Sequence, residues 1–300
     1  MPSNHQVLAN ITSISDPYEG ILLDAYGVFW GGNSVGLFPG SNEIMENLIK
    51  KGKIVGILSN STQLAANEID KLRNYGLIPG RHFHFLTTSG EVAKEIFRHE
   101  QFPFVTPRKK YWLLGEPHPN FSSHLPIFKE SSYTETSNIQ EADFIYVSIP
   151  HINGEDQTNP DLFLVKLEQL KGCGIPMVCT NPDRVAHEGS PPRAVVRQGS
   201  IAKMYERIGG QVFYIGKPSS IVYSAAMNLF NQYRIIDRKQ VLMVGDTPET
   251  DVKGARNFGM PAALVTKTGV MSDRISKDGF DHTVGRFSSD EIPEYFIAHL

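Results

Sequence analysis

Short apolar runs alternate with amphipathic stretches over most of the chain. Apolar runs at residues 20–28 and 53–60 predict buried strands. Between them, residues 41–51 repeat apolar side chains at the spacing of a helix, and Gly52 ends that pattern. The same alternation of strand and helix recurs over residues 211–266. Such an order predicts a parallel sheet with helices on both faces, so we expect a doubly wound α/β fold.

The middle of the chain is more irregular. From about His82 to Gly209, prolines interrupt further strand and helix candidates. A stretch of this length is not a loop, because connections without secondary structure rarely exceed about 12–15 residues in a compact domain. We therefore expect a second α/β domain, inserted at residues 82–209. Residues 1–81 and 210–300 are then expected to form one discontinuous core domain.

Composition and charge narrow the function classes. The chain has 300 residues, of which 40% are apolar, and this is enough for two such domains. Its 29 basic and 32 acidic residues give a formal net charge of −3, which argues against a nucleic-acid partner. No apolar run reaches the roughly 18 residues of a membrane helix, and residues 1–16 do not resemble a signal peptide, so no membrane association is expected. Two cysteines, Cys173 and Cys179, exclude a disulfide framework and favour the reducing cytoplasm.

Polar or charged side chains follow four of the predicted strands, and a second acid lies five residues beyond the last of them. These residues are Asp24, Ser59, Asn60, Lys217, Asp246 and Asp251. Singly, each is typical of a turn or a helix cap. Together they indicate a site, because the carboxyl ends of parallel strands meet at one edge of a sheet, and open α/β folds bind their ligands at that edge. The pattern predicts a binding or catalytic site at that edge.

In these segments the sequence resembles the haloacid dehalogenase (HAD) superfamily, and in particular the NagD-like phosphatases of subclass IIA, which carry a large type II cap. The most specific motif is GDxxxxD, in which Asp246 and Asp251 follow an apolar strand and precede a glycine-rich helix. The resemblance implies a Rossmann-like core with the cap inserted between the second and third motifs. The other resembling segments are LLDAYGVFWGG, the Pro-Gly pair before the first helix, GILSNST, TNPD and YIGKPSS.

The resemblance implies a Mg²⁺-dependent hydrolase that acts on a small phosphorylated metabolite. Asp24 matches the family nucleophile, which attacks phosphorus and forms an aspartyl-phosphate, so that one difficult displacement becomes two easier ones. Mg²⁺ prefers oxygen ligands, and here they are implied to be Asp24, Asp246 and the main-chain carbonyl of Tyr26. Asp251 matches the family acid that orients metal-bound water.

Other family positions are implied to bind the phosphate and to select the substrate. Lys217 matches the lysine that holds the nucleophile and the phosphate together. Ser59 and Asn60 match the region that donates hydrogen bonds to phosphoryl oxygens. In the cap, Asn181 and Asp183 of the TNPD segment are implied to face the substrate, and a simple Asn-Pro-Asp turn is the alternative. Caps of this type often dimerise, so a homodimer is one implied assembly.

The first motif departs from the family at Tyr26. Family phosphatases usually read DxD, and their second Asp protonates the leaving alkoxide and then activates water, whereas this chain reads DAYG. A tyrosine with a pKa near ~10 is poorly matched to that work at neutral pH. Three interpretations stay open: a slow or specialised phosphatase, a phosphate-ligand-binding protein on a decayed enzyme scaffold, or a 2-haloacid dehalogenase, whose nucleophile motif DAYG also resembles. The joint presence of Asp246 and Asp251 favours the phosphatase, since dehalogenation needs no metal.

The remaining conspicuous side chains are interpreted as structural. His82 and His84 alternate on a predicted strand, but no third metal ligand has a suitable spacing, so we expect ordinary solvated or core histidines. Nearby aromatic residues are expected to build the core of the inserted domain. They are Phe83, Phe85, Phe102 and Phe104.

Overall fold

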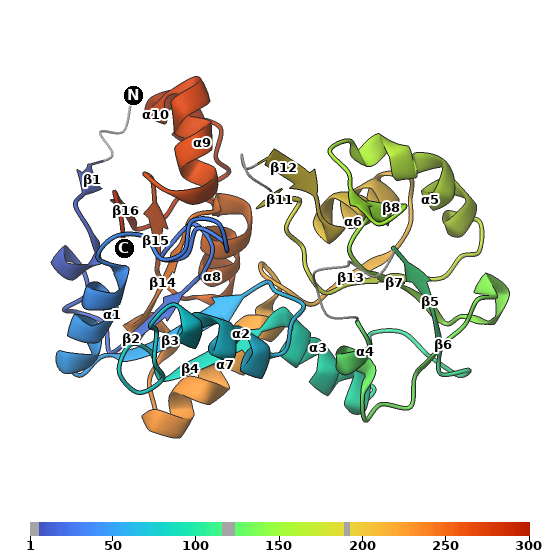
Figure 1. Cartoon of the computed structure of the whole chain (residues 1–300), viewed down its shortest axis with the longest axis horizontal. Coiled ribbons are helices and arrows are strands. Elements are labelled where there is room, and N and C mark those ends of the chain that lie inside the picture. The colour runs from blue at the N-terminus through green and yellow to red at the C-terminus, as the bar shows by residue number, and fades with distance from the viewer. Residues whose placement is uncertain (1–5, 116–123, 189–192) are drawn as a thin grey trace. The chain divides into compact units, whose positions relative to one another are not determined.

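A computed structural model describes residues 6–115, 124–188 and 193–300 of the chain. The chain folds into two compact units (Figure 1). The first, called the core unit, comprises Met1–Ser59, Ala65–Thr87 and Lys217–Leu300. The second, called the insertion unit, comprises Asn60–Leu64 and Thr88–Gly216.

A seven-stranded sheet runs through the core unit in the order β1-β16-β15-β14-β2-β3-β4. The pairings from β1 through β3 are parallel, and Leu22 of β2 lies between Gly56 of β3 and Met243 of β14. The central strands consist almost wholly of buried apolar residues, as expected of a parallel sheet that is covered on both faces. The strands are β1 Val7–Leu8, β2 Gly20–Leu23, β3 Ile54–Ser59, β4 Phe85–Thr88, β14 Val241–Gly245, β15 Ala262–Val265 and β16 Tyr295–Ile297.

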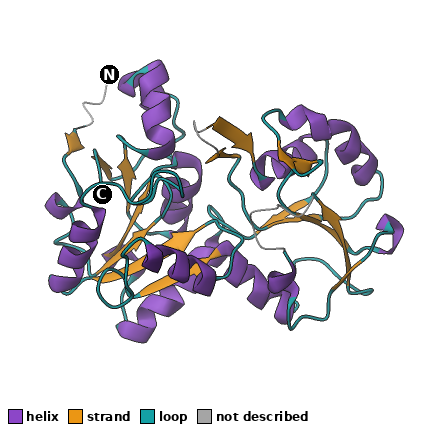
Figure 2. Ribbon diagram, viewed as in Figure 1, coloured by secondary structure: helices purple, strands orange, loops and turns teal. Residues whose placement is uncertain are grey.

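Helices cover both faces of this sheet (Figure 2). On one face, Ile21 of β2 shares a buried hydrophobic cluster with Met45 of α1 and Leu72 of α2. Because side chains alternate along a strand, Gly20 faces the opposite way, and there the Phe230 ring of α7 leaves only 2.8 Å for a Cβ. The two layers confirm the doubly wound α/β prediction. The helices are α1 Ser41–Lys50, α2 Ala65–Asn74, α7 Ser220–Tyr233, α8 Lys253–Phe258, α9 Gly269–Asp278 and α10 Phe280–Val284.

The insertion unit is also an α/β fold. Its five-stranded sheet has the order β13-β10-β7-β5-β6, and all four pairings are parallel. These strands are β5 Lys110–Leu114, β6 Thr134–Glu135, β7 Phe144–Val147, β10 Met177–Cys179 and β13 Val212–Tyr214. Two antiparallel pairs accompany the sheet, namely β8 His151–Ile152 with β9 Glu155–Asp156 and β11 Val185–Glu188 with β12 Arg193–Val196. The helices are α3 Ser89–Arg98, α4 Leu125–Phe128, α5 Leu164–Lys171 and α6 Gln198–Arg207.

The described residues also include short helices of other types. The 3-10 helices are Ile11–Ser13, Ile139–Glu141, Pro160–Phe163 and Arg238–Gln240, and one π-helical turn spans Pro248–Val252. Among these described parts, no helix is both long enough and apolar enough to cross a membrane. Both Cys173 and Cys179 are free thiols.

The two faces of the insertion-unit sheet pack differently. Ile145 and Val147 of β7 face an aliphatic cluster that includes Leu167 of α5. On the other face, the Phe144 ring of β7 lies 5.4 Å from that of Phe102, within a group of stacked and edge-on aromatic rings. Phe104 belongs to the same group, as expected. Phe83 and Phe85 do not, because both lie in the core unit, so the prediction for these two was wrong.

The boundaries of the insertion differ from those expected. Residues 82–87 were predicted to belong to the inserted domain but lie in the core unit, because β4 adds to the core sheet beside β3. Residues 210–216 were predicted to belong to the core but lie in the insertion unit, because β13 pairs with β10. Residues 60–64 also belong to the insertion unit.

His82 and His84 are structural residues of the core unit. The Nδ1 atom of His82 accepts a hydrogen bond from the Ile78 amide at 2.9 Å, and that of His84 accepts one from the Val55 amide at 3.0 Å. Burial lowers the pKa of both imidazoles. A ring nitrogen that accepts a hydrogen bond must be unprotonated, so both rings are neutral in the fold.

Candidate active site

Three adjacent strands of the core sheet deliver the predicted residues to one edge. Asp24 directly follows β2, Ser59 is the last residue of β3, and Asp246 directly follows β14. Since β14, β2 and β3 are neighbours and parallel, their carboxyl ends lie side by side. Lys217 and Asp251, from a loop and from the π-helical turn, join them there. The edge of the sheet thus gathers groups that are up to 227 positions apart in the sequence.

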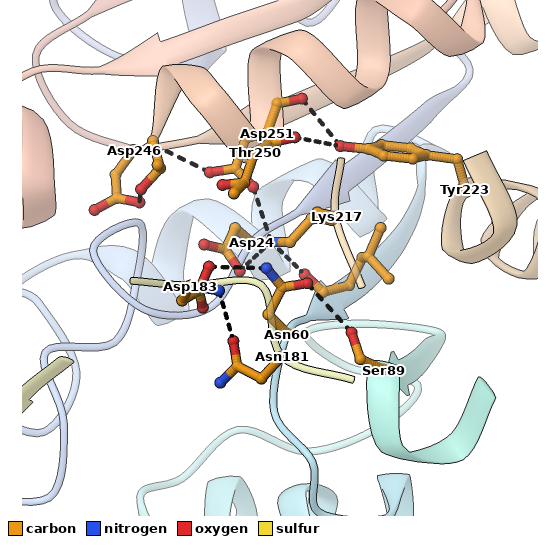
Figure 3. A network of polar contacts seen from close by, with 12 residues as sticks. Asp24, Asn60, Ser89, Asn181, Asp183, Lys217, Tyr223, Asp246, Thr250 and Asp251 are labelled. Atoms are coloured by element: carbon orange, nitrogen blue, oxygen red, sulfur yellow. Dashed lines mark hydrogen bonds and ion pairs between the residues drawn. The ribbon is translucent and has the colours of Figure 1, made fainter. Parts of the chain in front are cut away.

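Lys217 is the centre of this group. Its side chain is 1% exposed, and its Nζ lies 2.6 Å from Asp24 Oδ1 and 2.8 Å from Asp251 Oδ1 (Figure 3). The same ammonium donates a hydrogen bond to the main-chain carbonyl of Leu58 at 3.1 Å. A buried ammonium with three oxygen partners is held in one position. It therefore fixes the Asp24 and Asp251 carboxylates relative to each other.

Asp246 is held by an amide, a hydroxyl and two glycines. Its Oδ2 accepts a hydrogen bond from the Val270 amide at 2.6 Å, and its Oδ1 accepts one from the Thr247 hydroxyl at 2.9 Å. A Cβ on Gly27 would lie 2.1 Å from Oδ2, and one on Gly269 would lie 1.9 Å from it. Both glycines also have positive φ angles of 79° and 61°. Only glycine allows the backbone to approach the carboxylate this closely.

Asp251 is fixed at both its side chain and its main chain. Its Oδ2 accepts a hydrogen bond from the Thr247 amide at 3.1 Å, and the side chain lies over Gly245, where a Cβ would be 2.2 Å away. Its main-chain carbonyl accepts a hydrogen bond from the Tyr223 hydroxyl at 3.0 Å. Burial raises the pKa of Tyr223 well above its ordinary value, so the hydroxyl stays protonated and donates.

The site carries more negative than positive charge. Oxygen atoms of Asp24, Asp246 and Asp251 lie within 4.8 Å of one another, and Lys217 is the cation among them. Burial raises the pKa of Asp24 well above its usual range, although Lys217 acts in the opposite direction. Burial, together with repulsion from Asp251, raises the pKa of Asp246 to about 7. Carboxylate oxygens are the ligands that Mg²⁺ prefers, and a divalent cation would balance this charge, so these residues fit the expected metal.

Tyr26 packs against the loop that follows it. Its ring lies where a Cβ on Gly32 would be 3.3 Å from Cε2 and 3.6 Å from the hydroxyl oxygen. The main chain of Tyr26 forms an isolated bridge with Trp30, and the Gly27 amide donates to the Trp30 carbonyl at 2.8 Å. The tyrosine is therefore part of the packing of this loop.

The other predicted residues lie in the insertion unit. The side-chain Nδ2 of Asn60 donates a hydrogen bond to Asp183 Oδ1 at 2.8 Å, and the Ser89 hydroxyl donates one to Asn60 Oδ1 at 3.2 Å (Figure 3). Asn181 Oδ1 accepts a hydrogen bond from the Asp183 amide at 2.9 Å, which is the Asx turn weighed as the alternative for this segment. Both readings of Asn181 and Asp183 are thus compatible, because a turn can also present a side chain to a ligand.

The sequence reasoning missed the contribution of residues 268–270. Thr268 donates a hydrogen bond to the Gly27 carbonyl at 2.6 Å, Gly269 approaches Asp246, and Val270 donates its amide to that carboxylate. A signal was present, since a Thr-Gly pair follows the strand at residues 261–266 and so marks another polar turn at the same sheet edge. Tyr223 gave no such signal, because it lies inside an otherwise ordinary helix.

Comparisons with known proteins agree with this geometry. Residues 214–285 match the family model described as HAD-hydrolase-like. Chronophin of Mus musculus is 25% identical over 294 residues, which cover 94% of this chain and 90% of chronophin. The sugar-phosphatase AraL of Bacillus subtilis (strain 168) is 24% identical over 248 residues, which cover 82% of each chain.

Solved structures with a similar fold include hydrolases of the same kind. The crystal structure of a haloacid dehalogenase-like hydrolase from Brucella suis 1330 superposes with a TM-score of 0.78 at 21% identity, and the match covers 98% of this chain and 100% of that one. Fold, motifs and sequence relatives agree, and the expectation of a hydrolase is confirmed. The predicted resemblance to the haloacid dehalogenase superfamily, and within it to the NagD-like phosphatases, is confirmed.

Proposed function

We propose that this protein is a Mg²⁺-dependent hydrolase of phosphate monoesters that uses Asp24 as its nucleophile. The observation that carries the proposal is the cluster of Asp24, Asp246 and Asp251 around the buried Lys217. A cluster with excess negative charge requires a cation before a phosphate dianion can approach it. Relatives named as a sugar-phosphatase and a 4-nitrophenylphosphatase support the same chemistry.

Asp24, Asp246 and the main-chain carbonyl of Tyr26 would hold the metal, with Asp251 acting on its water. When bound, the ion would neutralise charge on the phosphoryl oxygens. Asp24 would attack phosphorus, the bond to the ester oxygen would break, and that oxygen would take a proton from solvent water. Water then attacks the phosphorus of the aspartyl-phosphate, which releases inorganic phosphate and restores Asp24.

Lys217 would serve both steps. At 2.6 Å from Asp24 it orients the attacking carboxylate and opposes its protonation. The contact with Asp251 at 2.8 Å holds it in place, so the ammonium is already positioned when substrate arrives. Ser59, at the end of β3, is proposed to donate a hydrogen bond to a phosphoryl oxygen. The segment around Asn60 is proposed to donate further hydrogen bonds to the phosphoryl oxygens.

Tyr26 is proposed to shape which phosphates are turned over. In place of an acid, a phenol is a weak proton donor at neutral pH, so substrates with good leaving groups should react best. If the loss is severe, the protein would bind a phosphate ligand and turn it over slowly, and Tyr26 is the observation that favours this second candidate. We also propose that Asn181 and Asp183 contact the organic part of a small phosphorylated metabolite.

A screen of metabolite phosphates, with release of inorganic phosphate as the readout, tests the proposal. The wild-type protein is assayed with Mg²⁺ and with EDTA beside Asp246→Ala, and Asp70→Asn serves as a control on an exposed helix. We expect turnover that requires Mg²⁺, is lost in Asp246→Ala and is unchanged in Asp70→Asn. Turnover equal in EDTA, or halide release from 2-haloacids without metal, would refute the proposal in favour of the dehalogenase. Tight binding of a phosphate ligand without turnover would favour the second candidate.

A further inference from the structure

Tyr223 is a buried residue of the core unit that the chemistry above does not use. It lies in α7 (Ser220–Tyr233) and is fully buried. Its hydroxyl lies 3.2 Å from the main-chain carbonyl oxygen of Thr250 and 3.0 Å from that of Asp251 (Figure 3). One hydroxyl group thus contacts two consecutive carbonyls in the turn that carries an active-site acid.

The main-chain hydrogen bonding of the helix changes in this turn. Pro248–Val252 is π-helical and leads directly into α8 at Lys253, so the regular ladder of main-chain hydrogen bonds changes its period there. The Thr250 carbonyl oxygen already accepts a hydrogen bond from the Lys253 amide, so the Tyr223 hydroxyl is an additional donor that ties this junction to α7. Gly254 makes room for the ring, since a Cβ there would lie 2.5 Å from Tyr223 Cε2.

The same contact links the two ends of a buried ion pair. The helix α7 begins three residues after Lys217, and Asp251 is the partner of Lys217 at 2.8 Å. Tyr223 therefore ties the helix that follows the lysine to the turn that carries the carboxylate. A shift of the turn would change the ion pair, and with it the contact of Lys217 with Asp24 at 2.6 Å.

We propose that Tyr223 is a positioning residue, which holds the Asp251 turn against Lys217 and so sets the arrangement of the nucleophile and the metal ligands. This inference deepens the proposed function and rests on it for its kinetic consequence. Its structural content, that one hydroxyl fixes the turn, stands apart from any activity.

Tyr223→Phe removes only the hydroxyl, and Tyr205→Phe is its matched control. Tyr205, in the insertion unit, is also buried, donates to the main-chain carbonyl of Ile175 at 3.0 Å, and packs on Gly210 as Tyr223 packs on Gly254. Both variants therefore lose a hydroxyl that donates to main-chain carbonyl oxygens, those of two residues for Tyr223 and that of one for Tyr205, and both should show a decrease in Tm. A difference between the two variants in kinetics or metal binding would therefore reflect a changed position of the Asp251 turn and not a general loss of stability.

We expect Tyr223→Phe to lower kcat for p-nitrophenyl phosphate roughly 10-fold at saturating Mg²⁺, the lower end of the range for residues that support a metal site, with KM within about 2-fold. Calorimetry should show weaker Mg²⁺ binding, and the crystal structure should show Asp251 displaced from Lys217. Tyr205→Phe should match the wild type in all three. An unchanged kcat, Mg²⁺ affinity and Lys217–Asp251 distance in folded Tyr223→Phe would overturn the inference, as would equal losses in Tyr205→Phe. A wild type without turnover refutes the proposed function, and the crystal structures then decide on Tyr223 alone.

Discussion

The charge imbalance of the site predicts that removing one acid stabilises the metal-free protein while it abolishes activity. Asp246 is 2% exposed, and burial with repulsion from Asp251 raises its pKa from 3.8 to about 7. At about 1.4 kcal/mol for each tenfold change in an acid constant, its charge disfavours folding by roughly 4 kcal/mol above pH 7. Asp246→Asn removes that charge and keeps nearly the same shape.

The substitution also preserves much of the hydrogen bonding. An asparagine oxygen can accept from the Val270 amide, now 2.6 Å from Oδ2, and its amide can donate to the Thr247 hydroxyl oxygen, now 2.9 Å from Oδ1. Replacing charge-assisted bonds by neutral ones loses about 1–2 kcal/mol. The net gain is therefore roughly 2–3 kcal/mol, or a rise in Tm of about 5–10 °C for a domain of this size.

Thermal unfolding in EDTA at pH 8 measures this gain, with Asp70→Asn as the control for the same chemical change at an exposed position. An acid whose pKa is raised by folding is destabilising above that pKa and becomes neutral below it. The advantage of Asp246→Asn should thus be full above pH 7 and disappear as pH falls toward 4. Mg²⁺ should raise the Tm of the wild type and leave that of Asp246→Asn unchanged. A variant no more stable than the wild type in EDTA, or equally stabilised by Mg²⁺, would contradict the reasoning.

Three other outcomes are expected. Asp24→Asn should lower turnover by roughly 10³-fold or more with little change in the circular dichroism spectrum, and near-normal turnover would exclude Asp24 as nucleophile. Tyr26→Asp should raise turnover of alkyl phosphates by roughly 10-fold relative to aryl phosphates, a fraction of the range for a general acid, and no relative gain in a folded variant would show that Tyr26 does not replace that acid. Protonation of His82 and His84 should disfavour the fold as pH drops below about 6.5, because both are neutral in the fold and burial lowers their pKa; in urea titrations, a variant with both changed to Gln should therefore gain stability relative to the wild type as pH falls, while the opposite contribution of Asp246 is common to both proteins.

The sheet and the main acids could be predicted because they depend on local patterns. Buried parallel strands are continuous apolar runs, and the residue after each run lies at the ligand-binding edge, so Asp24 and Asp246 follow from the chain itself. The limits of the insertion could not be predicted in the same way. The strands β4 and β13 are apolar runs like the others, and only pairing with β3 or β10 decides to which sheet each belongs. Such pairing is a property of distant segments.

The glycine contacts at Asp246 show the same limit at the scale of single atoms. Gly27 and Gly269 are 242 positions apart, and in sequence each resembles an ordinary turn glycine. In the structure, a Cβ on either glycine would lie about 2 Å from an oxygen of the Asp246 carboxylate and would clash with it. Their importance depends on a meeting of two loops that no local pattern encodes. A search for glycines at the predicted sheet edge would nevertheless have found both as candidates.

Tyr26, which replaces the second Asp of the DxD motif, also packs against the loop that follows it. The position reads as the loss of an acid when the motif is considered alone. In the structure its ring fills space beside Gly32, which has a φ of 89° and would place a Cβ 3.3 Å from that ring. The loop therefore depends on an aromatic side chain here, and an aspartate would leave both a gap and a partly buried charge. The proton donor and the packing of the loop are thus alternatives at one position, so a gain in rate on alkyl phosphates should be accompanied by a lower Tm in the same Tyr26→Asp protein.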